Sequence, residues 1–377
     1  MLKSSSDALR GLGFIRPGVL IDADRTRANI RRMADRAAAS GVLFRPHFKT
    51  HQSGSVGQWF RDLGVTRITV SSLDMAAYFA DFDWTDITLA VVVNPLELPS
   101  LAELAQRLKE KGGRLGLTVD SVATAAALRA VDDLPVTVWL KVDGGYGRTG
   151  LRWDDTAGLQ TVTDALGPAL RPAGLLAHSG HSYGARGPAR LQEIWSESVH
   201  RLQAARNALG PEIKLSLGDT PCCSTVADFT GVDEVRPGNF VFYDLMQLDI
   251  GACAADDLAA AAVCPVLGVY PERGQMVLHG GAVHLAKESL TLPDGRPCYG
   301  KLGTEADGPD RVIHAAPLVS LSQEHGTVQI DDPDDFQRIC GDLIPGDLVR
   351  VWPVHSCLTC DLHRDYRTGD GQVLPRR

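Results

Sequence analysis

Two hydrophobic periods alternate along the first two thirds of the chain. Short apolar runs rich in β-branched residues predict eight strands, at residues 42–49, 67–72, 87–93, 114–119, 136–142, 174–178, 214–218 and 234–240. Amphipathic stretches between most of them predict helices at 26–39, 101–111, 123–130 and 190–209. Strands that alternate with helices favour parallel pairing. Their number and the chain length predict a (β/α)8 TIM barrel, with a doubly wound open sheet as the alternative.

The pattern changes after about residue 248. Short strands at 266–270, 275–278, 328–330 and 348–352 are separated by Gly, Pro and Asp turns, which predicts a second, mostly β domain. Residues 18–24 also read as a strand, either a ninth for the barrel or part of the β domain. We therefore expect a barrel at 25–247 and a β domain made of 1–24 and 248–377.

Composition excludes several classes of protein. The 377 residues are 44% hydrophobic and 22% charged, which is ordinary for a globular protein. A net charge of -8 argues against a nucleic-acid surface. No apolar run reaches the roughly 18 residues of a membrane span, and the first residues have no apolar signal core. Eight cysteines are too sparse for a disulfide scaffold, so we expect a reducing cytoplasm.

The clearest candidate for chemistry lies near the end of the chain. His355 and Cys357 are one residue apart, so on an extended segment both side chains point to the same face. Imidazole and thiolate are the ligands that zinc prefers. Two protein ligands leave positions open for substrate or water, which favours a catalytic over a structural metal.

A second candidate is a lysine in the first predicted barrel strand. Arg45, His47 and Lys49 alternate along that strand and would share one face. Barrel strands carry functional residues at their carboxyl ends, where Lys49 lies. A lysine partly desolvated in a barrel mouth suits Schiff-base chemistry, whereas a solvated lysine at a strand end is the plain alternative.

Other strand ends carry polar, glycine-rich segments. A loop at 142–150 contains Arg148, and a second segment at 178–184 contains Tyr183. Further segments at 218–221 and 236–239 follow the last two barrel strands. Loops after strands seven and eight often anchor phosphate in this fold. Together these segments predict one active site at the carboxyl end of the barrel.

The same segments carry a family resemblance. The runs RPHFKTHQS, DGGYGRTG, HSGHSYG, GDTP, EVRPGNFVFYD, SQEHG and PVHSCLT come in the order found in one group of enzymes. The sequence resembles the D-serine dehydratase / D-threonine aldolase family of pyridoxal-phosphate enzymes over residues 18–359. The resemblance implies the alanine-racemase type of fold (PLP fold type III), with the strand at 18–24 joining the β domain.

The resemblance also implies roles for particular residues. Lys49 would hold pyridoxal 5'-phosphate covalently and act in catalysis. Thr220, Gly238 and Asn239 would surround its phosphate, largely through backbone amides. Tyr183 would contact the phosphate or the ring, and Arg148 is a candidate partner of the pyridine ring. His355 and Cys357 match the metal pair of the dehydratases, whereas the aldolases typically carry an aspartate at the position of Cys357.

Several neighbouring residues are expected to be structural. We interpret Cys360 as a packing residue, since a third ligand would begin to close the metal site. His325 reads as a turn residue of the β domain, either one that supports the site or simply a surface histidine. Lys287 reads as a solvated or ion-paired lysine, and the Cys222–Cys223 pair as packing under the phosphate loop. The segment 279–284 departs from the family, which usually carries an aspartate before its glycine.

These observations predict a lyase acting on a 3-hydroxy D-amino acid. Soft ligands favour Zn²⁺, with other divalent metals left open, and they favour elimination of water to a 2-oxo acid and ammonia. Retro-aldol cleavage to glycine and an aldehyde is the alternative, followed by an amino-acid racemase and a non-catalytic cofactor-binding protein. We expect a small-molecule amino-acid substrate, no nucleic-acid or membrane partner, and, from the resemblance, a homodimer.

Overall fold

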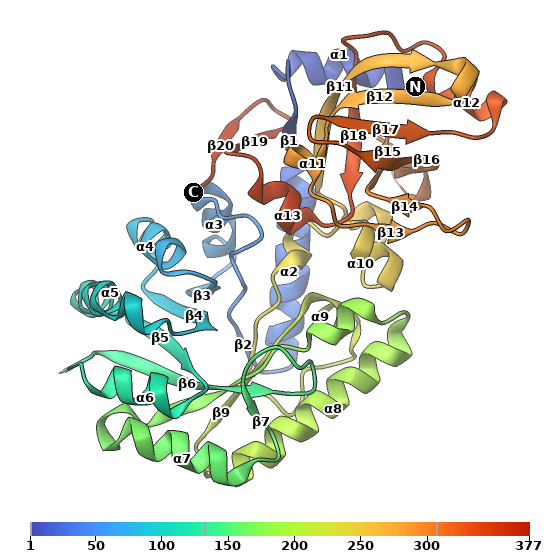
Figure 1. Ribbon diagram of the computed structural model, residues 1–377. Helices are drawn as coiled ribbons and strands as arrows, with labels where there is room; N and C mark the ends of the chain where they lie inside the picture. The colour runs from blue at the N-terminus through green and yellow to red at the C-terminus, as the bar shows by residue number, and fades with distance from the viewer. Residues whose placement is uncertain (1, 132, 307) are drawn as a thin grey trace. The chain divides into compact units, whose positions relative to one another are not determined.

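The computed structural model describes residues 2–131, 133–306 and 308–377 (Figure 1). Its contacts divide the chain into two compact units, one of residues 1–30 and 239–376, the other of residues 31–238 with residue 377. We call the first the β unit and the second the barrel unit. The limits expected from the sequence, 24/25 and 247/248, lie a few residues away, and the assignment of those residues stays a prediction.

Eight parallel strands form the barrel unit's sheet, in the order β2-β10-β9-β8-β6-β5-β4-β3. A parallel bridge between His47 and Thr69 joins its two ends, with Phe48 donating to the Thr69 carbonyl at 2.9 Å. The sheet is therefore closed, and the open-sheet alternative is wrong. The strands are β2 (Leu43–Phe44), β3 (Arg67–Val70), β4 (Asp86–Val92), β5 (Arg114–Val119), β6 (Val136–Asp143), β8 (Pro172–Leu176), β9 (Lys214–Leu217) and β10 (Glu234–Val235).

The first and last barrel strands are shorter than expected. Pro46 follows β2 and Pro237 follows β10, and a proline has no N–H to continue a ladder. A further short strand, β7 (Leu151–Arg152), pairs only with β6. Backbone bonds nevertheless continue past both strands, from the Arg45 amide to the Val235 carbonyl and from the His47 amide to the Pro237 carbonyl. The chain then turns, and Lys49 lies in that turn.

Helices lie outside the ring of strands (Figure 1). They are α2 (Ala23–Ala39), α3 (Gly54–Arg61), α4 (Leu73–Asp81), α5 (Leu98–Glu110), α6 (Val122–Arg129), α7 (Thr156–Leu166), α8 (Pro188–Asn207) and α9 (Thr220–Thr225). Ser121 caps α6 by accepting a bond from the Thr124 amide, as its position predicts. Helices α3, α4, α7 and α9 were not expected from the sequence; α9 is only six residues long and begins just after the end of β9.

Charged side chains fill part of the barrel interior. Arg45 is buried and pairs with Glu234 and Asp86, both at 2.6 Å. It lines a cavity of about 180 Å³ with Arg114 and Lys214, the first residues of β5 and β9. Arg45 therefore belongs to the amino-terminal end of the barrel, and the expectation that it shares a site face with Lys49 is wrong.

The β unit contains a nine-stranded sheet in the order β12-β17-β16-β15-β18-β11-β1-β19-β20. Strand β1 pairs antiparallel with β11 and parallel with β19, which confirms that the N-terminal strand belongs here. The strands are β1 (Gly18–Ile21), β11 (Ala260–Tyr270), β12 (Gln275–His279), β15 (Gly300–Gly303), β16 (Val312–Leu321), β17 (His325–Gln329), β18 (Leu348–Pro353), β19 (Asp365–Thr368) and β20 (Val373–Pro375). A separate hairpin joins β13 (Leu290–Thr291) to β14 (Pro297–Cys298).

Among the described residues, the β unit also contains five α-helices. They are α1 (Leu2–Gly11), α10 (Leu245–Ile250), α11 (Ala282–Leu285), α12 (Pro333–Cys340) and α13 (Ser356–Asp361). One hydrophobic core of the unit gathers apolar side chains from the sheet and from α12, among them Leu278, Val328 and Phe336. Within the described residues, no helix combines the length and the apolar character needed to cross a bilayer.

Candidate active site

The lysine segment is anchored by its aromatic neighbour. Phe48 is fully buried, with ring centroids of Phe60, Phe79 and Trp84 between 4.8 and 5.0 Å away. The Lys49 amide donates to Nδ1 of His47 at 3.3 Å. The backbone of Lys49 is thus fixed while its side chain is exposed. The expectation of a partly desolvated lysine is therefore wrong for this structure, and the amine is open to a carbonyl partner.

Basic side chains gather around this turn from three other strands. Lys141 lies on β6, His178 follows β8, and Arg236 follows β10. Burial, together with the charges of Arg236 and Arg148, lowers the pKa of Lys141 to about 7. Burial lowers the pKa of His178 to about 3, although its Nδ1 lies 2.8 Å from the Gly218 carbonyl. Lys141 and His178 resist protonation because they are buried among like charges, whereas Arg236, with a pKa lowered to about 10, stays charged at neutral pH. An anion bound among these groups would therefore be stabilised.

The glycine-rich loop after β6 is organised by one carboxylate. Asp143 accepts bonds of 2.9 to 3.1 Å from the amides of Gly145, Tyr146 and Gly147. The Tyr146 ring lies 5.9 Å from the ring of His178 in an edge-to-face arrangement. Arg148 is exposed, with its guanidinium 5.2 Å from the centroid of Tyr146. The loop thereby brings the predicted ring partner, Arg148, to the same end of the barrel as Lys49.

Close backbone packing surrounds the predicted phosphate loop. The Gly238 amide donates to Oγ1 of Thr220 at 3.3 Å. A Cβ on Gly238 would lie 2.9 Å from the His47 carbonyl oxygen, so only glycine fits there. Asp219 caps α9 and accepts a bond from Ser182, while its Oδ2 is buried without a partner among the described residues. Burial raises the pKa of Asp219 to about 6.

Tyr183 lies in a short 3-10 helix, Gly180–Gly184, with its ring centroid 6.3 Å from that of His178. The barrel unit therefore groups Lys49, Arg148, Tyr183, Thr220 and Gly238 around one set of buried basic residues. This donor set suits a cofactor that carries both a phosphate and a carbonyl, because it offers cations, a close backbone and an exposed amine.

The predicted metal pair lies in the β unit. His355 precedes α13, and its Nδ1 lies 2.6 Å from Oε2 of Glu288. Burial opposes protonation of this imidazole, but the Cys357 sulfur and the Glu288 carboxylate raise the pKa of His355 to about 11. The three side chains thus form one ion-paired group of nitrogen, sulfur and oxygen donors, a set that suits Zn²⁺.

Asn239 lies beside the metal pair. Its side-chain amide donates to Asp244 at 2.6 Å, to Ser356 at 3.0 Å and to the sulfur of Cys357 at 3.6 Å. The Asn239 side chain therefore contacts the predicted metal segment, and its role at the phosphate stays a prediction. Cys360 is fully buried, and burial raises the pKa of its thiol to about 12, which agrees with a packing role.

Sequence reasoning missed several residues of these groups. Lys141 and His178 are basic residues in barrel strand segments, a signal that the sequence offered. Glu288 is 67 positions from His355 and has no motif, so nothing in the sequence pointed to it. His279, His284 and Glu324, which come from three segments of the β unit, also meet in space.

A closed parallel barrel with a lysine at its carboxyl end, followed by a β unit, defines a protein of the alanine-racemase fold. Two family models match the chain, the "Alanine racemase, N-terminal domain" over residues 21–245 and the "Putative serine dehydratase domain" over residues 259–368. The chain belongs to the family that combines these two domains.

Relatives from several organisms cover nearly the whole chain. The chain is 34% identical to a D-threo-3-hydroxyaspartate dehydratase of Delftia sp. (strain HT23), over 91% of each chain. It is 27% identical to a D-serine dehydratase of Dictyostelium discoideum, over 95% of this chain and 94% of that one. It is 25% identical to a 3-hydroxy-D-aspartate aldolase of Paracoccus denitrificans, over 93% and 87%. The relatives are thus dehydratases and aldolases, which are lyases.

Solved structures give the same picture. The Delftia dehydratase superposes with a TM-score of 0.86 at 32% identity, over 97% of this chain and 98% of that one. Two variants of D-threo-3-hydroxyaspartate dehydratase are also solved, one with a histidine and one with a cysteine replaced by alanine, the latter described as metal-free; these positions are two residues apart. An alanine racemase of Clostridium difficile matches with a TM-score of 0.66 at 13% identity, which shows the fold alone.

Proposed function

We propose that the protein is a lyase that depends on pyridoxal 5'-phosphate and a divalent metal and eliminates water from a 3-hydroxy D-amino acid, giving a 2-oxo acid and ammonia. The observation that carries the proposal is the ion-paired group of His355, Cys357 and Glu288. The histidine and cysteine have the spacing of the two positions substituted in the solved variants of D-threo-3-hydroxyaspartate dehydratase, of which the cysteine variant is described in a metal-free form. The thiolate also favours elimination over aldol cleavage, because the aldolases that the sequence resembles typically carry an aspartate at the position of Cys357.

The cofactor, when bound, supplies the electron sink that makes the Cα proton acidic. Lys49 is the residue that would hold it, and its Nζ is the base that would take the Cα proton. Thr220 and Gly238 would donate to the phosphate, and the cations around His178 would balance its charge. Burial lowers the pKa of His178, so its ring is neutral at neutral pH.

The metal, when held by His355 and Cys357, supplies a Lewis acid for the β-hydroxyl group. Glu288 orients the imidazole of His355 through the bond to Nδ1, which leaves Nε2 for the metal. Asn239 donates to Cys357 and so steadies the thiolate in its reactive orientation. The proposal assigns the base, Lys49, to the barrel unit and the metal ligands, His355 and Cys357, to the β unit.

The test is product analysis on zinc- and cofactor-loaded protein with D-serine, D-threonine and 3-hydroxy-D-aspartate. Oxo acid and ammonia together are the expected products, and the L-enantiomers serve as controls for the D preference. Aldehyde with glycine would instead assign the aldolase reaction, which the relatives from Paracoccus denitrificans support as the second candidate. Loss of optical rotation without either product would indicate a racemase, and no turnover of any substrate would indicate a binding protein.

Two substitutions separate the roles of the units. Replacing Lys49 by Ala is expected to abolish both turnover and the visible absorbance of the bound cofactor. Replacing Cys357 by Ala is expected to lower zinc content and elimination by at least a hundredfold while the cofactor absorbance stays, because second ligands of catalytic zinc are rarely dispensable. Cys253→Ala, at a half-buried cysteine outside both groups, is the matched control. Full turnover by metal-stripped Cys357→Ala protein would contradict the proposal.

A further inference from the structure

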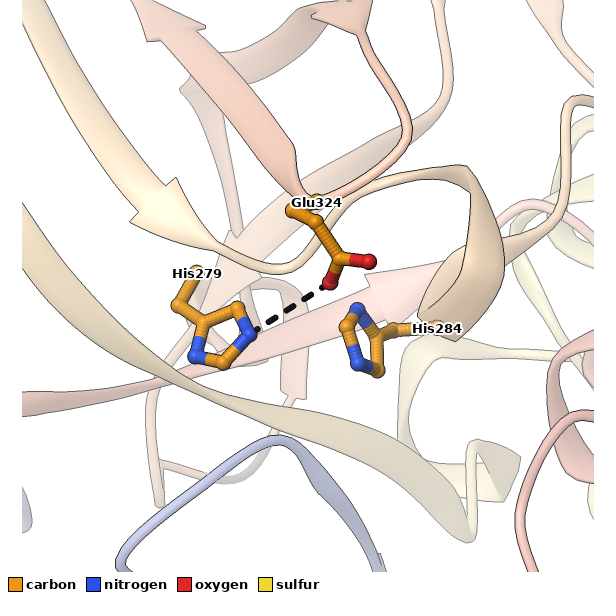
Figure 2. Close-up of side chains that lie close together, drawn as sticks. All are labelled: His279, His284 and Glu324. Atoms are coloured by element: carbon orange, nitrogen blue, oxygen red, sulfur yellow. Dashed lines mark ion pairs between the residues drawn. The ribbon is translucent and has the colours of Figure 1, made fainter.

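A second group of potential metal ligands lies in the β unit. His279 ends β12, His284 lies in α11, and Glu324 lies in the turn between β16 and β17. One ligand atom from each lies within 4.8 Å of the other two. Nε2 of His279 is 3.6 Å from Oε2 of Glu324, and Figure 2 shows both rings with a nitrogen turned towards the carboxylate. None of these residues belongs to the group of His355, Cys357 and Glu288.

The three segments are held together by backbone hydrogen bonds. The Gly280 amide donates to the Glu324 carbonyl at 2.9 Å, and the Ala282 amide donates to the Ser322 carbonyl at 2.8 Å. His279 is the partner of His325 in the β12–β17 ladder. A Cβ on Gly281 would lie 2.3 Å from the Gln323 carbonyl oxygen, so the two segments approach as closely as backbones can. The three side chains therefore project from a preorganised frame.

The imidazoles in this group are suited to binding a cation. The two rings lie 5.2 Å apart and perpendicular, so neither stacks on the other. Nδ1 of His284 is buried and has no hydrogen-bond partner among the described residues. Burial lowers the pKa of His284, with a smaller effect from His363, so the ring keeps its lone pair at neutral pH. A buried nitrogen without a partner is unfavourable and is stabilised when a ligand or a metal engages the ring.

We propose that His279, His284 and Glu324 form a second divalent-cation site, selective for zinc-like metals, in addition to the metal pair at His355 and Cys357. Two imidazoles and one carboxylate suit Zn²⁺ and leave at least one position for water. The proposal does not rest on the proposed function, because the two sets of ligands have no residue in common.

The position of the site gives it a structural role. Thr359 in α13 donates to the Leu285 carbonyl at 3.0 Å, and Nε2 of His363 lies 3.0 Å from the His284 carbonyl oxygen. Helix α11 therefore packs against the helix that carries Cys357. An ion bound to His284 would tie α11 to the β12 and β17 strands, and would thereby stabilise the support of the metal pair.

The test is zinc stoichiometry on untagged, cofactor-loaded protein, measured by plasma mass spectrometry after equilibration with excess zinc and gel filtration. We expect two zinc ions per chain in the wild type and one in Glu324→Gln, whose exposed side chain can change without repacking the core. His325→Gln, next to Glu324 but outside the ligand group, is the matched control and keeps two. One ion per chain in the wild type, unchanged by Glu324→Gln, would overturn the proposal.

A second measurement isolates the site from the metal pair. In Cys357→Ala, where the metal pair is disabled, one zinc ion and a zinc-dependent rise in Tm are expected to remain. Adding Glu324→Gln to this variant is expected to remove both, while its Tm in EDTA stays that of the parent. A Cys357→Ala protein with no bound zinc and no shift in Tm would also overturn the proposal, whatever its turnover.

Discussion

The pKa of Lys141 is set by the burial of its side chain and by the charges around it. Its side chain lies inside the barrel, and burial and neighbouring positive charges lower its pKa from 10.5 to about 7. The unfolded chain therefore binds more protons than the folded one between about pH 7 and 10.5, and stability must rise with pH across that window. Below about pH 7 the lysine is charged in both the folded and the unfolded state, so the folded protein bears the full cost of burying that charge.

This predicts the effect of replacing Lys141 by Met. In cofactor-free protein, the variant should exceed the wild type in free energy of unfolding by a few kcal/mol at pH 6, since one pKa unit corresponds to about 1.4 kcal/mol. The difference should shrink towards zero as the pH approaches 10.5. Urea unfolding at pH 6, 8 and 10 measures it, with Lys109→Met on the outer helix α5 as the control. A difference that does not change with pH would contradict the prediction.

Spacing in the sequence revealed some site residues and concealed others. His355 and Cys357 could be paired because two positions on one extended segment share a face. Glu288 could not, since it reaches His355 from a segment 67 residues away through tertiary folding alone. Lys49 was expected to be desolvated because its neighbours are apolar. Phe48 turns into the core instead, and the turn after Pro46 leaves the lysine exposed.

Among the elements, the loop after β6 depends most on one side chain. Replacing Asp143 by Ala removes the acceptor of three backbone amides, at 145, 146 and 147. Amide hydrogen exchange across residues 144–150 should then become at least tenfold faster, because local opening no longer breaks those bonds. Mass spectrometry of peptic fragments measures this. Asp154→Ala, which removes an exposed ion pair with Arg152, should leave the exchange unchanged.

The same loop has a predictable response to acid. Burial would raise the pKa of Asp143, but the three amides outweigh it and the pKa is lowered. A carboxylate with a depressed pKa stabilises the fold above its unfolded value and loses that contribution as the pH falls through the folded value. Protection of residues 144–150 should therefore persist at pH 5 and be lost only well below about pH 4. Earlier loss would mean that other contacts hold the loop.

Helices and strands with a clear hydrophobic periodicity could be predicted from the sequence, whereas those defined by their tertiary partners could not. The strand at 114–119 coincides with β5, and the helix at 190–209 overlaps α8. By contrast, β2 and β10 are two residues long, although backbone bonds between the two segments continue as far as His47 and Pro237. Strand β15 is four residues long with a glycine at each end, so no local pattern indicated it. Strand β16 was missed although it is largely apolar.

At the scale of the whole molecule, the two ends of the chain fold as one body. Asp347, just before β18, accepts bonds from Lys3 at 2.7 Å and Arg10 at 3.0 Å, both in α1, and its side chain is fully buried. Replacing Asp347 by Ala should lower the free energy of unfolding by about 1–3 kcal/mol, because the Ser6 hydroxyl and the Ile344 amide lose their acceptor.

Limited proteolysis provides the second measurement for this variant. Cleavage between residues 11 and 17 should become faster as α1 detaches, while fragments of the barrel unit stay protected. Lys3→Met removes only a half-exposed partner and should cost less than about 1 kcal/mol. Equal destabilisation by both substitutions would mean that α1 is held by its apolar face and not by Asp347.

The pairing of β1 also sets an order of events during protein synthesis. Strand β1 leaves the ribosome first, yet its partners are residues 260–263 and 366–368. Translation proceeds at about 5–20 residues per second, so β1 waits tens of seconds for its second partner. Meanwhile the residues of the barrel unit, 31–238, are all available. The antiparallel edge of β1 can therefore pair with residues 260–263 of β11 well before residues 366–368 are available, so its parallel edge stays open longest.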